Sequence, residues 1–206
     1  RTTLYKGQLK DPTGRRWVRK TNLKKAFSLS NNVIFGRTAQ IYSDGQSLYK
    51  SAQKMGIEND IMQLLPLNSP QVMIPTNKYQ VAEMASGFNK KTMISPIHGA
   101  VIAQIIANDG ALKRPYLISK ITDKEDKEDI YQSKIQSEQR IKTELAQKVK
   151  AMMVHTVERG TARRVFRRRT KALKALQIGG KTGTITGGVP FGKRDWFSSF
   201  AIPKDG

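Results

Sequence analysis

One segment in the middle of the sequence predicts a helix that is apolar on nearly every side. Ser95-Pro96 is a strong helix start, because serine caps free backbone N–H groups and proline suits the first turn. Residues 97–107 are mostly isoleucine, valine and alanine, and Asn108-Asp109-Gly110 ends the pattern. A helix with apolar side chains all round is buried within the protein. The other elements must therefore be arranged around this helix.

Helical periodicity is concentrated early in the chain, and strand patterns are concentrated late. The 206 residues suffice for one domain with a real core, and residues 57–94 are mixed and loop-rich. This order favours an α+β fold in which helices and strands form separate layers. Besides the apolar helix, we predict a helix beginning at Thr21, helices over 30–42, 46–55 and 143–158, and strands over 116–121, 130–135, 178–185 and 196–202.

The charge is strongly positive and unevenly distributed. Lysine and arginine number 37 against 16 aspartates and glutamates, which gives a net charge of +21. No acidic residue occurs within 159–194, whereas five lie within 123–129, a predicted hairpin tip. Such a field attracts nucleic acid, acidic lipid or an acidic wall polymer. The basic run 163–174 has Phe166 alone as an aromatic residue and matches no nucleic-acid-binding motif, so acidic lipid or wall polymer is favoured.

The composition excludes several kinds of site. The sequence has no cysteine, which excludes disulfides, thiolate metal sites and a cysteine nucleophile. His98 and His155 lack companions at metal-ligand spacing. We therefore predict structural or surface roles for both histidines, and we expect no metal or other cofactor.

Lys181-Thr182-Gly183-Thr184 lies within the first of the two late strands. Alternation along a strand places the hydroxyls of Thr182 and Thr184 on the same face. Gly183 has no side chain, so a ligand backbone can lie against the strand there. Two hydroxyls beside a lysine ammonium form a site for a carboxylate, and the Thr184 N–H can act as an oxyanion donor.

Ser30-Asn31-Asn32 is a second element, at the predicted start of a helix. A serine hydroxyl and an asparagine amide within one turn can relay a proton and hold a lysine or a substrate carbonyl. The alternative is that Ser30 only caps the helix, which is the commoner role of serine at such positions. Taken alone, the element favours the capping interpretation.

Together the two elements resemble the transpeptidase family of penicillin-binding proteins, which shares Ser-x-x-Lys, Ser-x-Asn and Lys-Thr-Gly with serine β-lactamases. The resemblance covers residues 21–206 and implies an α+β, β-lactamase-like fold with an antiparallel sheet flanked by helices. It also implies that residues 1–206 form part of one such domain, truncated at both ends. Further landmarks in the family's order are residues 26–36, Gly87, Ser95-Pro96-Ile97, residues 106–110, Gly160-Thr161-Ala162 and residues 195–201.

The resemblance implies a role for each motif residue. Ser30 would relay a proton, Asn32 would hold the acyl side chain and the catalytic lysine, and Lys181 would supply positive charge near Ser30. The stretch Thr182-Gly183-Thr184 would bind the carboxylate of a D-Ala-D-Ala stem peptide of peptidoglycan or of a β-lactam antibiotic. The implied reaction is D,D-transpeptidation or carboxypeptidation through a serine ester, without a cofactor.

The family's Ser-x-x-Lys motif is expected before Ser30, and nothing within residues 1–29 fits it. Ser47-Leu48-Tyr49-Lys50 and Ser51-Ala52-Gln53-Lys54 match the pattern, but both follow Ser30 and are interpreted as coincidental. We therefore expect the nucleophilic serine to lie outside this sequence. We also expect that this polypeptide alone forms no stable adduct with penicillin.

The expected compartment is the cell envelope outside the cytoplasm, with an anchor in a segment that the sequence does not include. Two other functions stay open. The chain can be a β-lactam or wall-fragment sensor without turnover, or a basic nucleic-acid-binding domain whose motifs are coincidental. A Ser-x-x-Lys motif encoded upstream would favour the enzyme over both alternatives, and salt-dependent DNA retention without penicillin binding would favour the nucleic-acid-binding domain.

Overall fold

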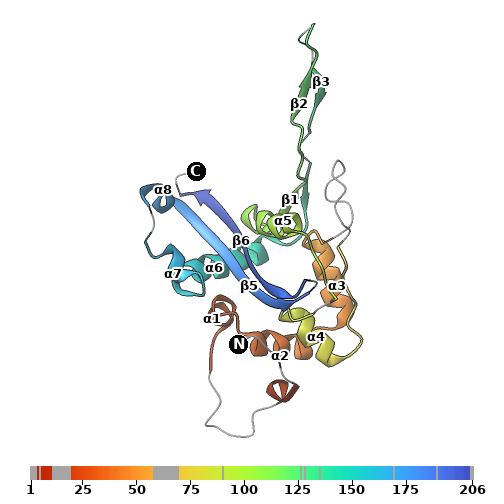
Figure 1. Cartoon of the computed structure of the whole chain (residues 1–206), viewed down its shortest axis with the longest axis vertical. Coiled ribbons are helices and arrows are strands. Elements are labelled where there is room, and N and C mark those ends of the chain that lie inside the picture. Colours follow the sequence, from red (N-terminus) through yellow and green to blue (C-terminus); the bar gives the residue numbers. More distant parts are fainter. Residues whose placement is uncertain are drawn as a thin grey trace.

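The computed structural model describes residues 4, 6–10, 20–57, 70–89, 91–125, 127, 129–134, 136–168, 170–188 and 190–204. Helices come first along the chain and a long strand pair comes last, which gives the α+β architecture that the sequence predicted (Figure 1). The elements are η1 (Lys6–Leu9), α1 (Leu23–Ser28), α2 (Asn32–Tyr42), α3 (Gly45–Lys54), α4 (Lys78–Ala85), α5 (Pro96–Ala107), β1 (Ala111–Lys113), β2 (Lys120–Thr122), β3 (Asp129–Gln132), β4 (Ser137–Gln139), α6 (Thr143–Arg159), α7 (Arg163–Phe166), α8 (Lys171–Lys174), β5 (Leu176–Gly187) and β6 (Gly192–Pro203).

The predicted buried helix is α5, and the structure confirms its burial. The buried isoleucine, valine and alanine side chains of α5 form two clusters, one with Leu112 of β1 and one with Met153 of α6 and Phe200 of β6. At its start, Ser95 Oγ lies 2.8 Å from Nδ1 of the buried His98, and the two residues form a reciprocal capping box. His98 therefore has the structural role that the sequence predicted. None of the helices in the described ranges is both long and apolar enough to cross a membrane.

One helix of the structure was not predicted from the sequence. Helix α4 lies within 57–94, where the sequence predicted a loop-rich segment. Asn77 caps α4 at 3.0 Å from the Gln80 N–H. The helix packs against α2, where a Cβ at Gly36 would lie 3.2 Å from the Cβ of the buried Ala82. Helix α4 has only eight residues, which is too short for a clear periodic pattern in the sequence, and tertiary packing stabilises it. Helix α6 begins at Thr143, as predicted, and ends at Arg159, one residue beyond the predicted end.

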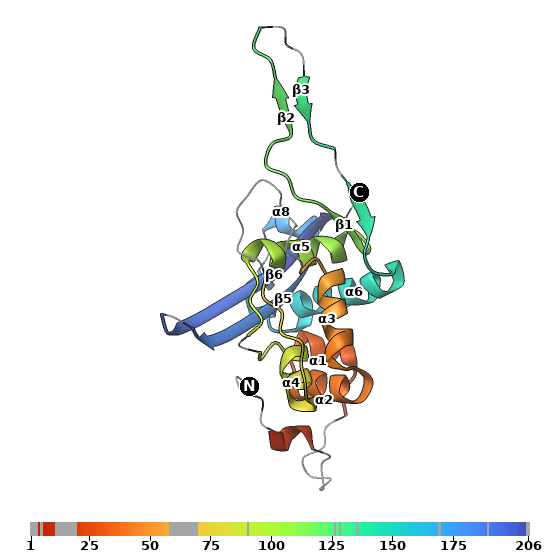
Figure 2. The same ribbon diagram turned by 90° about the vertical axis from the view of Figure 1, so that its right-hand side faces the viewer.

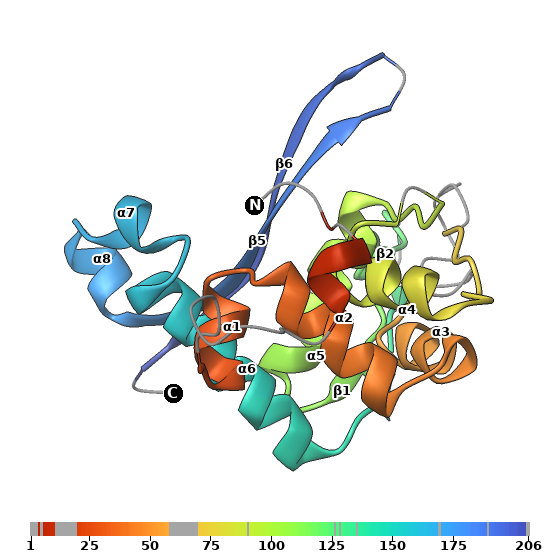
Figure 3. The same cartoon turned by 90° about the horizontal axis from the view of Figure 1, so that it is seen from below.

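The hairpin of β5 and β6 confirms the two late strands and extends both of them. Twelve residues of each strand pair antiparallel, and Lys181 lies opposite Ser198. Ser198 Oγ donates to the Gly99 carbonyl of α5 at 2.7 Å, so β6 is fastened to the buried helix. Figure 3 shows this hairpin extending well beyond the helices that cover its other end. The antiparallel sheet that the family resemblance implied thus consists of the two strands β5 and β6 within the described residues.

A separate ribbon projects from the molecule between α5 and α6 (Figures 1 and 2). Strand β1 pairs with β4 at its base, and β2 pairs with β3 farther out. Strands β2 and β3 overlap the strands predicted over 116–121 and 130–135 but are shorter and shifted in the described residues, and residue 135 lies outside these. Every residue of β2 and β3 is exposed, so little burial fixes where each strand begins and ends. The described part of the acidic run lies at the tip of this ribbon, as predicted.

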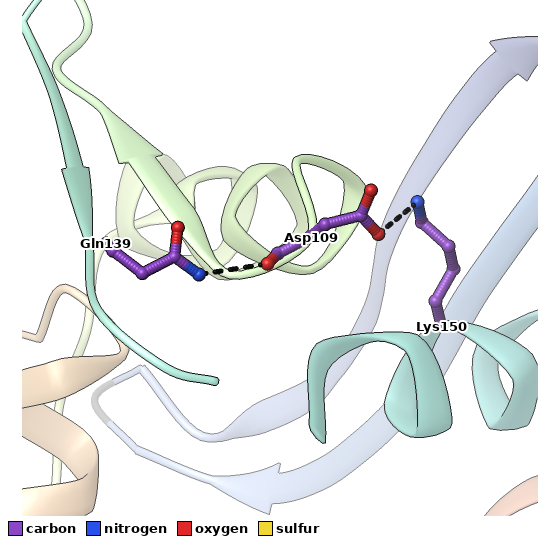
Figure 4. Close-up of polar contacts among 3 residues, drawn as sticks. All are labelled: Asp109, Gln139 and Lys150. Carbon is purple, nitrogen blue, oxygen red and sulfur yellow. Dashed lines mark hydrogen bonds and ion pairs between the residues drawn. The ribbon is translucent and has the colours of Figure 1, made fainter. Parts of the chain in front are cut away.

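The turn after α5 joins three parts of the fold (Figure 4). The Asp109 carboxylate accepts from Lys150 Nζ of α6 at 3.0 Å, and the Asp109 carbonyl accepts from Gln139 Nε2 of β4 at 3.1 Å. Gly110 has a φ of +99°, and a Cβ there would collide with the Ile141 carbonyl. Glycine is therefore required where the chain leaves the buried helix for the ribbon.

Candidate active site

Strand β5 brings Lys181 to the short connection between α1 and α2. Lys181 Nζ donates a hydrogen bond to Ser30 Oγ, although 151 positions separate the two residues in sequence. The same ammonium donates to the Thr182 carbonyl at 2.7 Å and lies 5.7 Å from the centre of the Phe27 ring. The predicted meeting of the early serine and the late lysine is therefore present in the structure.

The backbone at Ser30 excludes the capping interpretation. Asn31, and not Ser30, caps α2, because Asn31 Oδ1 accepts from the Ile34 N–H at 3.2 Å. Ser30 has a φ of +51°, a left-handed conformation that few residues other than glycine adopt. With the cap position occupied by its neighbour, the Ser30 hydroxyl is directed to Lys181 instead. Asn32 follows as the first residue of α2 and is half-buried.

The electrostatic environment of Lys181 is unusual for a lysine. Burial lowers the pKa of the Lys181 ammonium below its usual value of 10.5. A serine hydroxyl, a carbonyl oxygen and an aromatic face surround the cation, and none of the three carries a full negative charge. The site thus holds a partly desolvated positive charge, which favours an anionic ligand.

The two threonines of the motif have different hydroxyl partners. Thr182 Oγ1 lies 2.5 Å from Thr161 Oγ1, and either oxygen can be the donor. Thr184 Oγ1 donates to Asp195 Oδ1 at 2.7 Å, and Asp195 also accepts from Lys193 at 2.8 Å. The Lys193 ammonium, and then the Thr184 hydroxyl, hold the pKa of the Asp195 carboxyl below its usual range. Because Asp195 and Lys193 are exposed, a competing carboxylate can reach this hydroxyl.

The glycines at positions 179, 180 and 183 of β5 fall into two groups. A Cβ at Gly179 would overlap the ring of the buried Phe200, and a Cβ at Gly180 would lie 2.5 Å from Phe197 Cζ. These two glycines are required by packing inside the chain. A Cβ at Gly183 would meet only Trp196 Cβ, at an ordinary 3.5 Å. Contacts within the described structure therefore give no reason for glycine at position 183.

The two Ser-x-x-Lys matches that the sequence analysis interpreted as coincidental both lie on α3. Ser51 Oγ donates to the Ser47 carbonyl at 2.8 Å, a local bond within the helix. The Ser47 N–H is occupied by the Asp44 cap at 2.7 Å. Both serines thus have local structural roles.

Sequence reasoning missed two neighbours of the site. Phe27 belongs to the landmark residues 26–36 of the sequence analysis, which gave it no role in the site, and its ring lies under the Lys181 ammonium. Thr161 was noted only as a landmark before the strand, and its hydroxyl contacts Thr182. No local pattern could have identified either contact, because each joins segments more than 20 positions apart. Among the residues that the structure describes, no group of three potential ligands could hold a metal ion.

Comparisons with known proteins identify the family and the fold of the chain. A family model described as the penicillin binding protein transpeptidase domain matches residues 2–205. No curated protein matches the chain. Among solved structures, penicillin-binding protein A from M. tuberculosis, as an imipenem acyl-enzyme complex, has a TM-score of 0.71 at 22% identity over 88% of this chain and 39% of its own.

Other solved structures give similar values. The D,D-transpeptidase domain of a peptidoglycan glycosyltransferase from Eggerthella lenta has a TM-score of 0.71 at 22% identity, over 88% of this chain and 45% of its own. Penicillin binding protein 3 from Mycobacterium tuberculosis, complexed with ampicillin, has a TM-score of 0.67 at 20% identity, over 88% and 41%. The chain thus spans less than half the length of these relatives. Because the family model matches residues 2–205 of the 206, the chain belongs to the penicillin binding protein transpeptidase domain family.

Proposed function

We propose that this chain is part of a peptidoglycan D,D-transpeptidase that works through an acyl-serine intermediate. The contact between Lys181 Nζ and Ser30 Oγ is the observation that carries the proposal. This contact joins the Ser30 hydroxyl of the Ser-x-Asn motif to the Lys181 ammonium of the Lys-Thr-Gly motif, which lie 151 positions apart in the sequence. A sensor that binds without turnover is the second candidate, because a binding site needs the same cation and hydroxyls.

In the proposed reaction a serine oxygen attacks the carbonyl carbon of the penultimate D-Ala of a stem peptide. The C–N bond breaks, the terminal D-Ala leaves as an amine, and Ser30 passes a proton to that nitrogen. An amine of a second stem peptide then attacks the ester and releases the serine. Lys181 holds Ser30 in place, and Asn32 holds the acyl side chain and the catalytic lysine.

The carboxylate of the donor peptide is proposed to bind along β5. Thr182 and Thr184 supply hydroxyls, the Lys181 ammonium supplies charge, and the missing side chain at Gly183 lets the ligand backbone approach. The Thr184 hydroxyl must leave Asp195 when the ligand binds. A β-lactam carries a carboxylate beside a reactive amide and is expected to occupy the same positions.

The nucleophilic serine is proposed to come from a part of the protein outside this sequence. No Ser-x-x-Lys element precedes Ser30, and the two later matches lie on α3. Residues 1–206 are accordingly proposed to form one part of a transpeptidase domain. We propose an envelope location outside the cytoplasm, with the anchor in another segment of the protein.

The test uses the full-length protein that contains this chain, incubated with a fluorescent penicillin and analysed on denaturing gels. We expect a covalent adduct, mapped by peptide mass to a serine outside residues 1–206. Lys181→Ala and Ser30→Ala should reduce its rate of formation at least tenfold, while Ser47→Ala should have no effect. An adduct on Ser47 or Ser51, or unchanged rates in both site variants, would refute the assignment. Acylation without cross-linking of D-Ala-D-Ala peptides would favour the sensor.

We also propose that the exposed basic residues of α7, α8 and their connection contact an acidic wall polymer or acidic lipid. This basic surface consists of Arg163, Arg164, Arg167, Arg168, Lys171 and Lys174, all exposed. The test is retention on anionic vesicles and on an anionic wall polymer as salt is raised, compared with retention on DNA. Retention that is strongest on DNA would favour nucleic acid instead.

A further inference from the structure

A short connection after α6 contacts both halves of the candidate site. The Thr161 N–H donates to the Ser28 carbonyl at 3.0 Å, two residues before Ser30. The Thr161 hydroxyl lies 2.5 Å from the hydroxyl of Thr182, the residue that follows Lys181. One residue thus touches the segment that leads to the site serine and the strand that carries the site lysine.

The residues on both sides of Thr161 pack against the rest of the fold. A Cβ at Gly160 would lie 2.9 Å from Ser28 Cβ and would also collide with the Ser28 carbonyl, so the backbone lies directly against the end of α1. Ser28 is only 1% exposed. On the other side, Ala162 is buried in a cluster with Val157 of α6 and Ile178 of β5.

The pair of hydroxyls also determines which hydrogens can reach a ligand. A hydroxyl has one hydrogen and two lone pairs. When Thr161 donates to Thr182, the Thr182 hydrogen is available for a ligand carboxylate. Without the Thr161 hydroxyl, the Thr182 side chain loses the contact that orients its oxygen, and it must be ordered by the ligand itself.

We propose that Thr161 is a positioning residue, which holds the Thr182 hydroxyl in the orientation that binds the donor carboxylate. Its backbone N–H, bonded to the Ser28 carbonyl, holds the segment that leads to Ser30 in a fixed position relative to β5. This inference rests on the proposed function. Thr161 itself is not assigned any contact with the reacting atoms.

The test measures acylation of the full-length protein by a fluorescent penicillin, with the dissociation constant and the acylation rate constant resolved. Thr161→Ala removes the hydroxyl and keeps the backbone bond to Ser28, and Thr161→Ser restores a hydroxyl. Thr143→Ala, at the other end of α6, is the matched control. We expect Thr161→Ala to raise the dissociation constant about five- to tenfold, the usual effect of one lost hydrogen bond. Thr161→Ser should stay within about twofold of the wild type, on the same scale.

A penicillin ester tests the mechanism directly, because the ester removes the negative charge that Thr182 would bind. With the ester, wild type and Thr161→Ala should react alike. Equal dissociation constants for the acid would overturn the inference, as would an equal loss with acid and ester, which indicates a general structural defect. If the wild type itself forms no adduct, the proposed function fails, and the inference fails with it. A wild-type adduct with an unaffected Thr161→Ala variant refutes the inference alone.

Discussion

Two alanine substitutions four positions apart on β5 should have opposite effects on stability and on acylation. Gly179→Ala places a methyl group against Phe200, with Cε1 at 2.7 Å and Cε2 at 3.0 Å. The Phe200 ring is 8% exposed and packs against α5 and α6, so it cannot swing into solvent. Overpacking of this kind costs about 1–3 kcal/mol. In a domain of this size, each kcal/mol lowers Tm by about 2–4 °C.

Gly183→Ala should leave folding intact. Its Cβ meets Trp196 Cβ at 3.5 Å, an ordinary van der Waals contact, and φ at this position is not in the left-handed region. Replacing glycine at a compatible position stabilises a protein by about 0.4–1 kcal/mol, because the unfolded chain loses freedom. The new methyl group would occupy the space proposed for the ligand backbone. Its clash of about 1–3 kcal/mol would slow acylation about 5- to 150-fold.

The assay combines thermal unfolding of both variants with acylation of the full-length protein by a fluorescent penicillin. Gly179→Ala should show the lower Tm, and Gly183→Ala should show the slower acylation at a Tm equal to or slightly above that of the wild type. Wild-type acylation by Gly183→Ala would refute the claim that the ligand lies along this part of β5. A loss of Tm equal to that of Gly179→Ala would show that Gly183 is a structural residue after all.

Further predictions concern the pH dependence and two features of the fold. Burial lowers the pKa of Lys181 in the folded protein, so between the lowered pKa and 10.5 the unfolded chain binds more protons than the folded chain. The free energy of unfolding should therefore rise with pH in that range. In denaturant titrations, Lys181→Met should show a smaller rise than the wild type. Acylation by the full-length protein should instead fall as the pH passes that lowered pKa, and a pH–rate profile flat to pH 10.5 would contradict the need for the ammonium. Ser95→Ala should destabilise the chain by about 1 kcal/mol in urea unfolding, because it removes the cap of the buried α5. Gly110→Ala should destabilise the chain by at least about 1 kcal/mol, because Gly110 has a left-handed φ and its new Cβ would collide with the Ile141 carbonyl. Gly7→Ala is the control, because a Cβ at Gly7 meets no atom within 4 Å and should not destabilise the chain. Equal Tm values for the two variants would contradict this account.

The parts of the fold that sequence predicted well are those with strong local signals. Helix α5 combines a cap, a proline and continuous apolar residues, and the β5–β6 hairpin has two apolar strands separated by a glycine-rich turn. The prediction was poorer where local signals are weak. Helix α4 is short and depends on packing toward α2, and the exposed ribbon β2–β3 has little apolar burial to define its register.

The sequence alone determined the motifs, their order and therefore the family to which the site could belong. Only the tertiary structure decided that Ser30 is not a helix cap, because Asn31 takes that position and leaves the serine hydroxyl to Lys181. It also decided that Thr161 contacts Thr182 and that Gly183, unlike Gly179, is not required by packing. The physical reason is the same in each case. Caps, turns and periodicity depend on neighbours a few positions away, whereas these contacts join distant segments that only the packing of α1, α5 and α6 against the hairpin brings together.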